Sequence, residues 1–399
     1  MKLHIFNPEN DLALADGNAN YCPPPAACAI ASDLAVLPLW YAPEGDCVLL
    51  PGEQDLEFCK KMQELFSLAQ PFEPAMLGGV EGCVPWGWSA QMKRRLRAMG
   101  VEEGVLPCDA FLDDVRRLSN RRCAIELLST LVAAGVETAH KPLYFTSMDD
   151  VKTFVESMPR SVIKAPWSGS GRGIAWGIGR LEVPVEHFCK GVIRRQGGVV
   201  CEPFLDKVVD FAMEFFVSGG AVAFAGYSLF KCDGGAYSGN ILATDDAIEN
   251  FLAGFVGREA LSAVKEQLCL QLERLLCPVG YTGYLGVDML VYRRGEGFAL
   301  YPCVELNLRM NMGALSRVFY DRFVQPGCVG HFYVANFRGE GEALALHEGN
   351  KVSAPFVVRD GRLERGYMNL SPVSRESKYL AYVFVEENET SLASLYAGE

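Results

Sequence analysis

The sequence predicts a protein of mixed class, in which an α/β domain is followed by α+β units. At 399 residues the chain is too long for one ordinary hydrophobic core, so several packed units are expected. Short apolar runs first alternate with helix-like segments, which is typical of a parallel sheet covered by helices. Later strands instead pair across glycine-rich turns, which indicates antiparallel sheets.

The first domain is expected over residues 1–118. Its strands are predicted at "LHIFN", "CVLLPG" and "VEGCVPWGW", and its helices at "DLEFCKKMQELFSLA" and "SAQMKRRLRAMG". A polar, proline-rich loop follows the first strand, at the end of the strand where open α/β sheets bind ligands. The loop offers Asn7, Asn10, Asp11 and Tyr21 as candidate substrate contacts, and turn capping by these side chains is the competing explanation.

Three further segments are expected after the first domain. Residues 119–200 hold the helices "RRCAIELLSTLVAAG" and "MDDVKTFVESMP", a glycine-rich hairpin, and the helix "PVEHFCKGVIRRQ". Residues 201–329 begin within the strand "GVVCEPFL" and hold the strand "DFAMEFFV", a long helix and an acidic hairpin. Residues 330–399 form a β-rich extension that contains the strand "YLAYVFVEE".

Composition argues against several classes of protein. Half of the residues are hydrophobic, 22% are charged and the net charge is −12, so no nucleic-acid partner is expected, because phosphate contacts need clustered Lys and Arg. No apolar run approaches the ~20 residues of a membrane helix, and the amino terminus turns polar too soon for a signal peptide. We therefore expect a cytoplasmic protein without a membrane partner. The fourteen cysteines form no CxxC pair, which predicts reduced, mostly buried thiols.

The stretch "VIKAPWSGSGRGI", residues 162–174, places Lys164 before a glycine-rich loop. A Walker A loop would need a lysine after the glycines, and a dinucleotide fingerprint would have to open a helix. Because "GIAWGIG" follows and predicts a strand, the stretch is expected to form a hairpin. Backbone amides at its tip can cradle phosphate oxygens, with Lys164 supplying charge. A mobile surface hairpin with a solvated lysine is the alternative.

The acidic hairpin combines "YLGVDMLVY" with "FALYPCVELNLRM". Strand alternation places Glu305, Asn307 and Arg309 on one face, and Asp288 is expected opposite Glu305 on the partner strand. Two adjacent carboxylates repel unless a cation lies between them, and carboxylate and amide oxygens suit Mg2+. An ion-pair network of these acids with Arg309 or Lys231 is the alternative.

The lysine with its glycine hairpin, the "CEPFL" strand and the Asp288…Glu305-x-Asn307-x-Arg309 hairpin, in this order, resemble the ATP-grasp superfamily over roughly half of the chain. The resemblance implies a Rossmann-like parallel-sheet domain at the amino terminus, followed by two α+β subdomains that sandwich ATP. It also implies a second lysine near the start of the helix after the first domain, where this chain departs from the pattern and offers Arg121 or Arg122, whose guanidinium can bind phosphate with a different geometry.

The resemblance implies a role for each matching residue. Phosphate would be held by Lys164, Ser168, Gly169, Ser170 and Gly171. Adenine would meet Glu202, Pro203, Phe204 and Leu205, and the ribose would meet Asp210, against the alternatives of a solvated strand end at Glu202 and a turn acid at Asp210. Mg2+, with Mn2+ as an alternative, would be bound by Asp288, Glu305 and Asn307. Arg309 and Lys164 would be catalytic. Lys231 would reach the phosphates, and "DGGAYSGN" after it would form a mobile or plain surface loop.

The activity implied is that of an ATP-dependent ligase that joins a carboxylate to an amine or thiol through an acyl phosphate. A small-molecule kinase on the same scaffold and a catalytically silent ATP-binding protein are the alternatives. Small-molecule carboxylate and amine substrates are the expected partners, and a homodimer stays open. Neither substrate is identified by the sequence.

Overall fold

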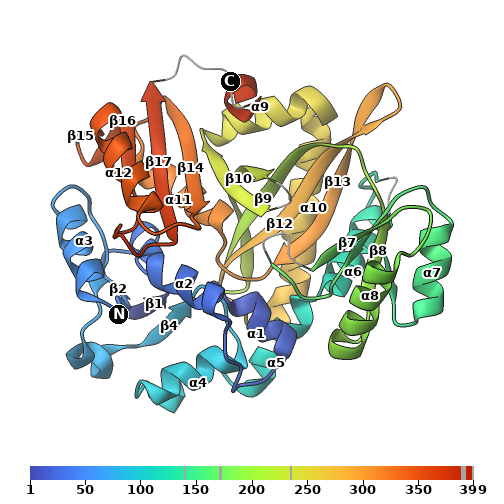
Figure 1. The fold of residues 1–399 in the computed structure, drawn as a ribbon, viewed down its shortest axis with the longest axis horizontal. Helices are drawn as coiled ribbons and strands as arrows, with labels where there is room; N and C mark the ends of the chain where they lie inside the picture. Colours follow the sequence, from blue (N-terminus) through green and yellow to red (C-terminus); the bar gives the residue numbers. More distant parts are fainter. Residues whose placement is uncertain (139–140, 170–172, 234–235, 388–391, 398–399) are drawn as a thin grey trace.

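The computed structural model describes residues 1–138, 141–169, 173–233, 236–387 and 392–397, and it consists of three sheets with covering helices (Figure 1). The first sheet has the order β3-β2-β1-β4 and is parallel, as predicted. Its strands are β1 (Lys2–Ile5), β2 (Cys47–Val48), β3 (Gln70–Pro71) and β4 (Gly82–Pro85). The accompanying helices are α1 (Asn10–Asp16), α2 (Pro25–Asp33), α3 (Glu53–Gln63), α4 (Ala90–Ala98) and α5 (Asp109–Leu118).

The second sheet is antiparallel and carries the glycine-rich hairpin. Its order is β5-β8-β6-β7. The strands are β5 (Leu143–Phe145), β6 (Ser161–Lys164), β7 (Ile174–Gly177) and β8 (Val199–Pro203). The helices in this part of the chain are α6 (Arg121–Ala133), α7 (Met148–Glu156) and α8 (Val183–Gln196). Helix α6 begins where the side chain of Asn120 accepts a hydrogen bond from the Arg122 amide, a capping contact that fixes the position of Arg121.

The third sheet has nine strands in the order β13-β12-β9-β10-β11-β14-β17-β16-β15. The strands are β9 (Lys207–Ser218), β10 (Ala221–Asp233), β11 (Ala236–Leu242), β12 (Gly283–Arg294), β13 (Gly297–Asn307), β14 (Cys328–Asn336), β15 (Val357–Arg359), β16 (Arg362–Asn369) and β17 (Tyr379–Glu387). The helices are α9 (Asp245–Val256), α10 (Arg258–Leu276), α11 (Met312–Phe323), α12 (Glu342–Ser353) and α13 (Leu392–Ala397). Short 3-10 turns occur at Leu37–Trp40, Pro74–Gly79, Glu103–Val105 and Cys277–Val279.

The prediction of a loop at "DGGAYSGN" is wrong for the residues that the structure describes. Residues 236–240 belong to β11, which pairs with β10 on one side and β14 on the other. The strand is buried toward its end, at Asn240 and Ile241. Its small side chains are therefore explained by its place between two other strands and not by a position on the surface. Residues 234–235 lie outside the described residues. Through the β11–β14 pairing, strands from the predicted β-rich extension continue the central sheet.

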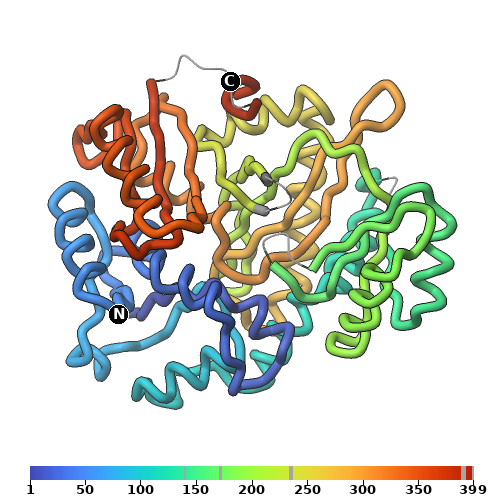
Figure 2. Tube along the Cα trace, viewed as in Figure 1, coloured from blue at the N-terminus to red at the C-terminus, as the bar shows by residue number. Residues whose placement is uncertain are grey.

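Parts of the chain far apart in sequence share one core. Figure 2 shows the carboxyl-terminal strands beside the amino-terminal segment. The indole of Trp40 is fully buried between the rings of Phe319 and Phe323, each 5.5 Å away, and its Nε1 donates to the carbonyl O of Leu370 at 2.8 Å. The first domain therefore packs against α11 and the end of the nine-stranded sheet.

Two global expectations can be compared with the structure. All fourteen cysteines lie in the described part of the chain and are free, and most of them are buried, as predicted. Among the described helices, none combines the length and the apolar character needed to cross a bilayer.

Candidate functional site

The predicted glycine hairpin is confirmed by the pairing of β6 with β7. Lys164 lies opposite Ile174, and the Ala165 amide donates to the Gly173 carbonyl O at 2.8 Å. The Trp167 amide donates to Gln196 Oε1 at 2.9 Å, which ties the start of the loop to the end of α8. Ser170 and Gly171, predicted to face phosphate, lie outside the described residues.

Gly169 lies close to a side chain of the first domain. A Cβ at this position would lie 2.4 Å from Oδ2 of Asp11 on α1. The neighbouring Ser168 is buried and its hydroxyl points into the protein, where it accepts a hydrogen bond from Arg121. The glycine loop is thus packed against the first domain on the side that faces α1.

Lys164 is buried and forms an ion pair with Glu202 on β8. Glu202 lies opposite Val162 in the sheet and also accepts a hydrogen bond from the Tyr301 hydroxyl at 3.2 Å. The alternative of a solvated strand end at Glu202 is therefore wrong, because the carboxylate lies inside the protein next to its cation.

The segment Pro203, Phe204 and Leu205 connects the second sheet to β9 of the central sheet. The Phe204 ring is covered by the guanidinium of Arg160 at 3.6 Å, and Leu205 packs against the main core. Asp210 follows within β9, opposite Phe230 and Leu290, so the alternative of a turn acid is wrong. Burial raises the pKa of Asp210, and its partner Lys207 opposes that rise.

The acidic hairpin has the predicted register, with Asp288 on β12 directly opposite Glu305 on β13. The Asn307 amide donates to Asp288 Oδ1 at 2.9 Å. Burial, and then the charge of Glu305, raise the pKa of Asp288 to about 7. Two carboxylates with this repulsion between them are stabilised by any cation that binds both.

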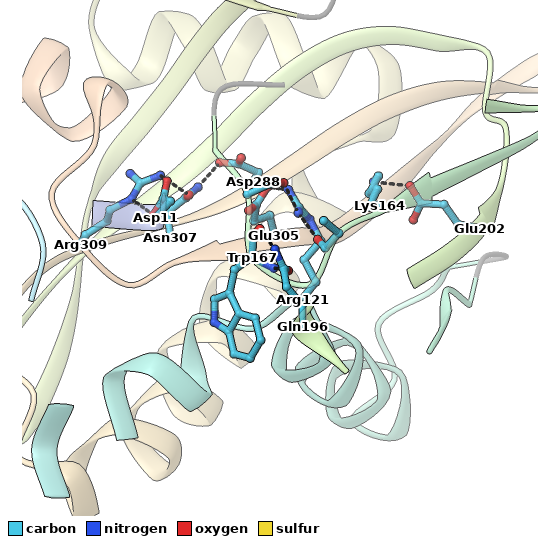
Figure 3. Close-up of polar contacts among 12 residues, drawn as sticks. Asp11, Arg121, Lys164, Trp167, Gln196, Glu202, Asp288, Glu305, Asn307 and Arg309 are labelled. Carbon is cyan, nitrogen blue, oxygen red and sulfur yellow. Dashed lines mark hydrogen bonds and ion pairs between the residues drawn. The ribbon is translucent and has the colours of Figure 1, made fainter. Parts of the chain in front are cut away.

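Arg121 joins the glycine hairpin to the acidic hairpin. Its Nη1 donates to the Ala165 carbonyl O and to Ser168 Oγ, both at 2.6 Å, and its Nη2 donates to Glu305 Oε2 at 2.5 Å (Figure 3). Only 6% of the Arg121 side chain is exposed, whereas the Arg122 side chain is 65% exposed. Arg122 forms an ion pair with Glu126, one turn along the same helix. Of the two arginines offered by the sequence, Arg121 is the one that enters the site.

Arg309 lies just after β13 and is held by the first domain. Its Nε and Nη2 donate to the two carboxylate oxygens of Asp11 at 2.7 and 2.6 Å, and Nη2 also donates to Asn307 Oδ1 at 3.1 Å. Asp11 is therefore at the site, as one of the candidate contacts from the first loop. Asn7 instead caps the Gly87 turn, donating to its carbonyl O at 2.9 Å and accepting from its amide at 3.2 Å.

The donor set at the acidic hairpin fits a divalent cation with few protein ligands. Asp288 and Glu305 supply carboxylate oxygens, and Asn307 supplies an amide oxygen, which are the hard donors that Mg2+ prefers alongside substrate phosphates. Within the described ranges, no cluster of three or more His, Cys, Asp or Glu side chains with metal-site geometry occurs. The hairpin resembles a site that shares its metal with a bound phosphate, not a closed all-protein cage.

Lys231 does not face this site. Ser228, Phe230 and Cys232 on β10 line the cavity, and alternation along the strand turns Lys231 to the opposite face of the sheet. There its Nζ donates to the Leu395 carbonyl O of α13 at 3.0 Å. The structure thus places Lys231 apart from the other residues predicted to hold the nucleotide.

Sequence reasoning missed Glu214, a carboxylate that is 1% exposed and lies on β9. It accepts a hydrogen bond from the Asn311 side chain at 2.8 Å. Burial raises its pKa to about 8. The strand alternation that links Asp210, Ala212 and Glu214 was the available signal, because it places all three on one face.

One cavity of about 180 Å3 unites most of these elements. Its lining includes Gly169 from the glycine loop, the hairpin residues Asp288, Glu305, Asn307 and Arg309, and Glu214 from β9. In the view of Figure 3, the Asp11–Arg309 pair and the Lys164–Glu202 pair lie on either side of Asp288 and Glu305. The cavity thus brings one residue of the glycine loop, the guanidinium of Arg309 and the carboxyl groups of Asp288, Glu305 and Glu214 around one space.

Comparison with solved structures identifies the fold. N5-carboxyaminoimidazole ribonucleotide synthetase from Thermus thermophilus matches all of this chain and 97% of its own, with 16% identity and a TM-score of 0.51. N5-carboxyaminoimidazole synthetase from Staphylococcus aureus complexed with ADP matches all of this chain and 95% of its own, with 10% identity and a TM-score of 0.50. The protein therefore has an ATP-grasp fold, as predicted. No protein-family model matches the sequence, and comparison with curated proteins gives no significant match.

Proposed function

We propose that the protein is an ATP-dependent ligase that joins a carboxylate to an amine or thiol through an acyl phosphate and requires Mg2+. The observation that supports this most is the shared cavity, in which a residue of the glycine loop and the acidic hairpin face each other. Arg121, which contacts both, holds the two walls together. The similar synthetase from S. aureus, with ADP bound, supports nucleotide use by the same fold.

Each residue group has a role in this proposal. Lys164 and the glycine loop from Ser168 to Gly171 bind phosphate oxygens, the segment from Glu202 to Leu205 contacts the adenine, and Asp210 binds the ribose. Asp288, Glu305 and Asn307 hold the metal, which when bound neutralises charge on the transferring phosphoryl group. Arg309 stabilises the oxyanion that develops on the carboxylate, and Asp11 fixes the orientation of its guanidinium.

This reaction requires that the substrates be correctly positioned, and it does not require a nucleophilic side chain of the protein. The substrate carboxylate attacks the γ-phosphorus, the bond to the β-phosphate oxygen breaks, and ADP leaves. The neutral amine, or a thiolate, then attacks the acyl carbon, the bond between that carbon and the phosphate oxygen breaks, and inorganic phosphate leaves. The proton that the attacking nitrogen loses passes to the departing phosphate or to solvent. Fixed donors supply most of such a rate enhancement, because they need no reorganisation during reaction.

The test combines binding with product analysis. We expect MgATP to raise the Tm of the protein, and Lys164→Ala and Asp288→Asn to abolish that rise. Phosphate release is then measured across pools of carboxylates and amines. A ligase releases phosphate only with both substrates present, a kinase gives a phosphorylated product without an amine, and a silent binding protein gives a Tm shift without turnover. Absence of any shift with MgATP contradicts the proposal.

A further inference from the structure

Glu214 is a buried carboxylate that no cation of the described chain neutralises by an ion pair. Its Oε2 accepts from Asn311 Nδ2 at 2.8 Å, and the Ser228 hydroxyl is its other side-chain neighbour. The guanidinium of Arg309 acts on it only at a distance, because that group is engaged by both oxygens of Asp11. Burying an ionised carboxylate without a counter-ion is costly, so Glu214 is mainly protonated at neutral pH when the cavity is empty, and a cation bound beside it would favour the ionised form.

The backbone around Glu214 is shaped to hold this carboxylate. A Cβ on Gly286 would lie 2.6 Å from Oε2, and a Cβ on Gly313 would lie 2.2 Å from Oε1. Both distances are shorter than real atoms allow, so β12 and the start of α11 leave room for the acid only because they carry glycine there. The carboxylate is thus fixed between two backbones, with the cavity in front of it.

The side chains that form hydrogen bonds around Glu214 are polar and uncharged. Ser228 accepts a hydrogen bond from Asn240 Nδ2 at 2.7 Å, and Asn240 in turn accepts one from the Tyr237 hydroxyl. Tyr237, Ser228 and Asn311 line the cavity beside Glu214. The surroundings of Glu214 therefore present hydrogen-bonding groups and one carboxyl group that can ionise beside a cation, which is complementary to a small cation that carries several N–H donors.

We propose that this end of the cavity is the subsite for the second substrate, and that it selects a small ammonium-bearing molecule by placing its cationic nitrogen on Glu214. This inference rests on the proposed ligase function and names the class of its acceptor. The acceptor would share this cavity of about 180 Å3 with the metal and the phosphate, which favours a compact group. Burial of Glu214 also lowers the local dielectric constant, which strengthens an ammonium–carboxylate contact there.

The test is a thermal-shift titration of the full chain with matched pairs of probes. Ethanolamine and glycinamide carry an ammonium, and ethylene glycol and glycolamide replace it by a hydroxyl. We expect the two amines to raise the Tm of the wild type, the two hydroxyl compounds to leave it unchanged, and Glu214→Gln to weaken the apparent affinity for the amines about tenfold or more. Glu249→Gln, the same change on α9 outside the cavity, should behave as the wild type.

The possible results separate the inference about Glu214 from the ligase proposal. Equal amine shifts in the wild type and Glu214→Gln, or no amine shift in either, would overturn the inference. Loss of the MgATP shift in Glu214→Gln would also overturn it, because the residue would then act on metal or nucleotide. A persistent MgATP shift shows that the variant is folded. If MgATP does not raise the Tm of the wild type, the ligase proposal is contradicted. The amine titration is carried out without nucleotide, so its result tests the Glu214 subsite independently.

Discussion

Asp11 and Arg309 form a two-point ion pair across 298 positions of sequence. Both N–H···O distances are 2.7 Å or less, and the two side chains are 20% and 15% exposed. The pair connects α1 of the first domain to the turn between β13 and α11. The first domain thereby sets the position of a guanidinium at the edge of the cavity.

We expect Asp11→Asn to lower the free energy of unfolding by about 3 kcal/mol, because it leaves a largely buried guanidinium without its carboxylate. Asp114→Asn is the matched control, since Asp114 forms an exposed pair with Arg117 and should cost less than about 1 kcal/mol. Urea unfolding of both variants measures the difference. Similar losses in the two variants would mean that Asp11 contributes no more than a surface acid.

Stability of the metal-free protein should depend on pH through two buried acids. The folded-state pKa is about 7 for Asp288 and about 8 for Glu214, whereas unfolded carboxyls titrate near about 4. Between these values the folded protein binds more protons than the unfolded chain, so the free energy of unfolding falls as pH rises from about 4 to about 8. Below about pH 4 both states are protonated and the penalty is absent.

Asp288→Asn and Glu214→Gln should each flatten this slope when urea unfolding is repeated across the pH range. Mg2+ should restore stability at high pH in the wild type but not in Asp288→Asn, because the ion needs the carboxylate. Variants whose stability runs parallel to the wild type at every pH would show that these acids do not carry the pH dependence.

Arg121 should be sensitive to a change that keeps its charge. Lysine cannot donate simultaneously to the Ala165 carbonyl, Ser168 and Glu305 as the planar guanidinium does. We expect Arg121→Lys to lower stability by about 2 kcal/mol and Arg121→Ala by about 3–5 kcal/mol. Arg122→Lys, one position along the same helix but exposed, should stay within about 0.5 kcal/mol. Equal effects at the two positions would contradict the bridging role of Arg121.

The last described helix should contribute to folding although it is short. Leu395 on α13 is 4% exposed in the main core, and its carbonyl O accepts from Lys231 Nζ and from His331 Nε2 at 3.1 Å. Leu395→Ala should cost about 2–3 kcal/mol, whereas Leu270→Ala, at a leucine that is 48% exposed, should cost little. A loss of stability at Leu395 no larger than at Leu270 would show that α13 is not docked in solution.

Local patterns were enough to predict both hairpins. Turn position and side-chain alternation fix the register of an antiparallel pair, so the juxtaposition of Asp288 with Glu305 followed from the sequence alone. Alternation could not tell which face of β10 meets the cavity, because "YSLFKC" places an aromatic residue on each face. The prediction for Lys231 depended on that choice.

Contacts between distant segments left no local pattern. Nothing around Asp11 marks it as the partner of Arg309, and nothing in "NRRC" distinguishes the buried Arg121 from the exposed Arg122. That distinction depends on how α6 is rotated against β13, which only the folded chain determines. Strand alternation could have placed Glu214 on the same face as Asp210, but its isolation from counter-ions is a property of its surroundings that no local pattern shows.

The enclosure of Trp40 has a consequence for synthesis of the protein. The residues that surround its indole, Phe319 and Phe323, and the carbonyl of Leu370 leave the ribosome hundreds of codons later. A nascent chain must therefore carry an exposed apolar surface on its first domain through most of translation, a stage at which aggregation competes with folding. Emission from this tryptophan, followed on stalled chains of increasing length, would report when that surface is finally covered.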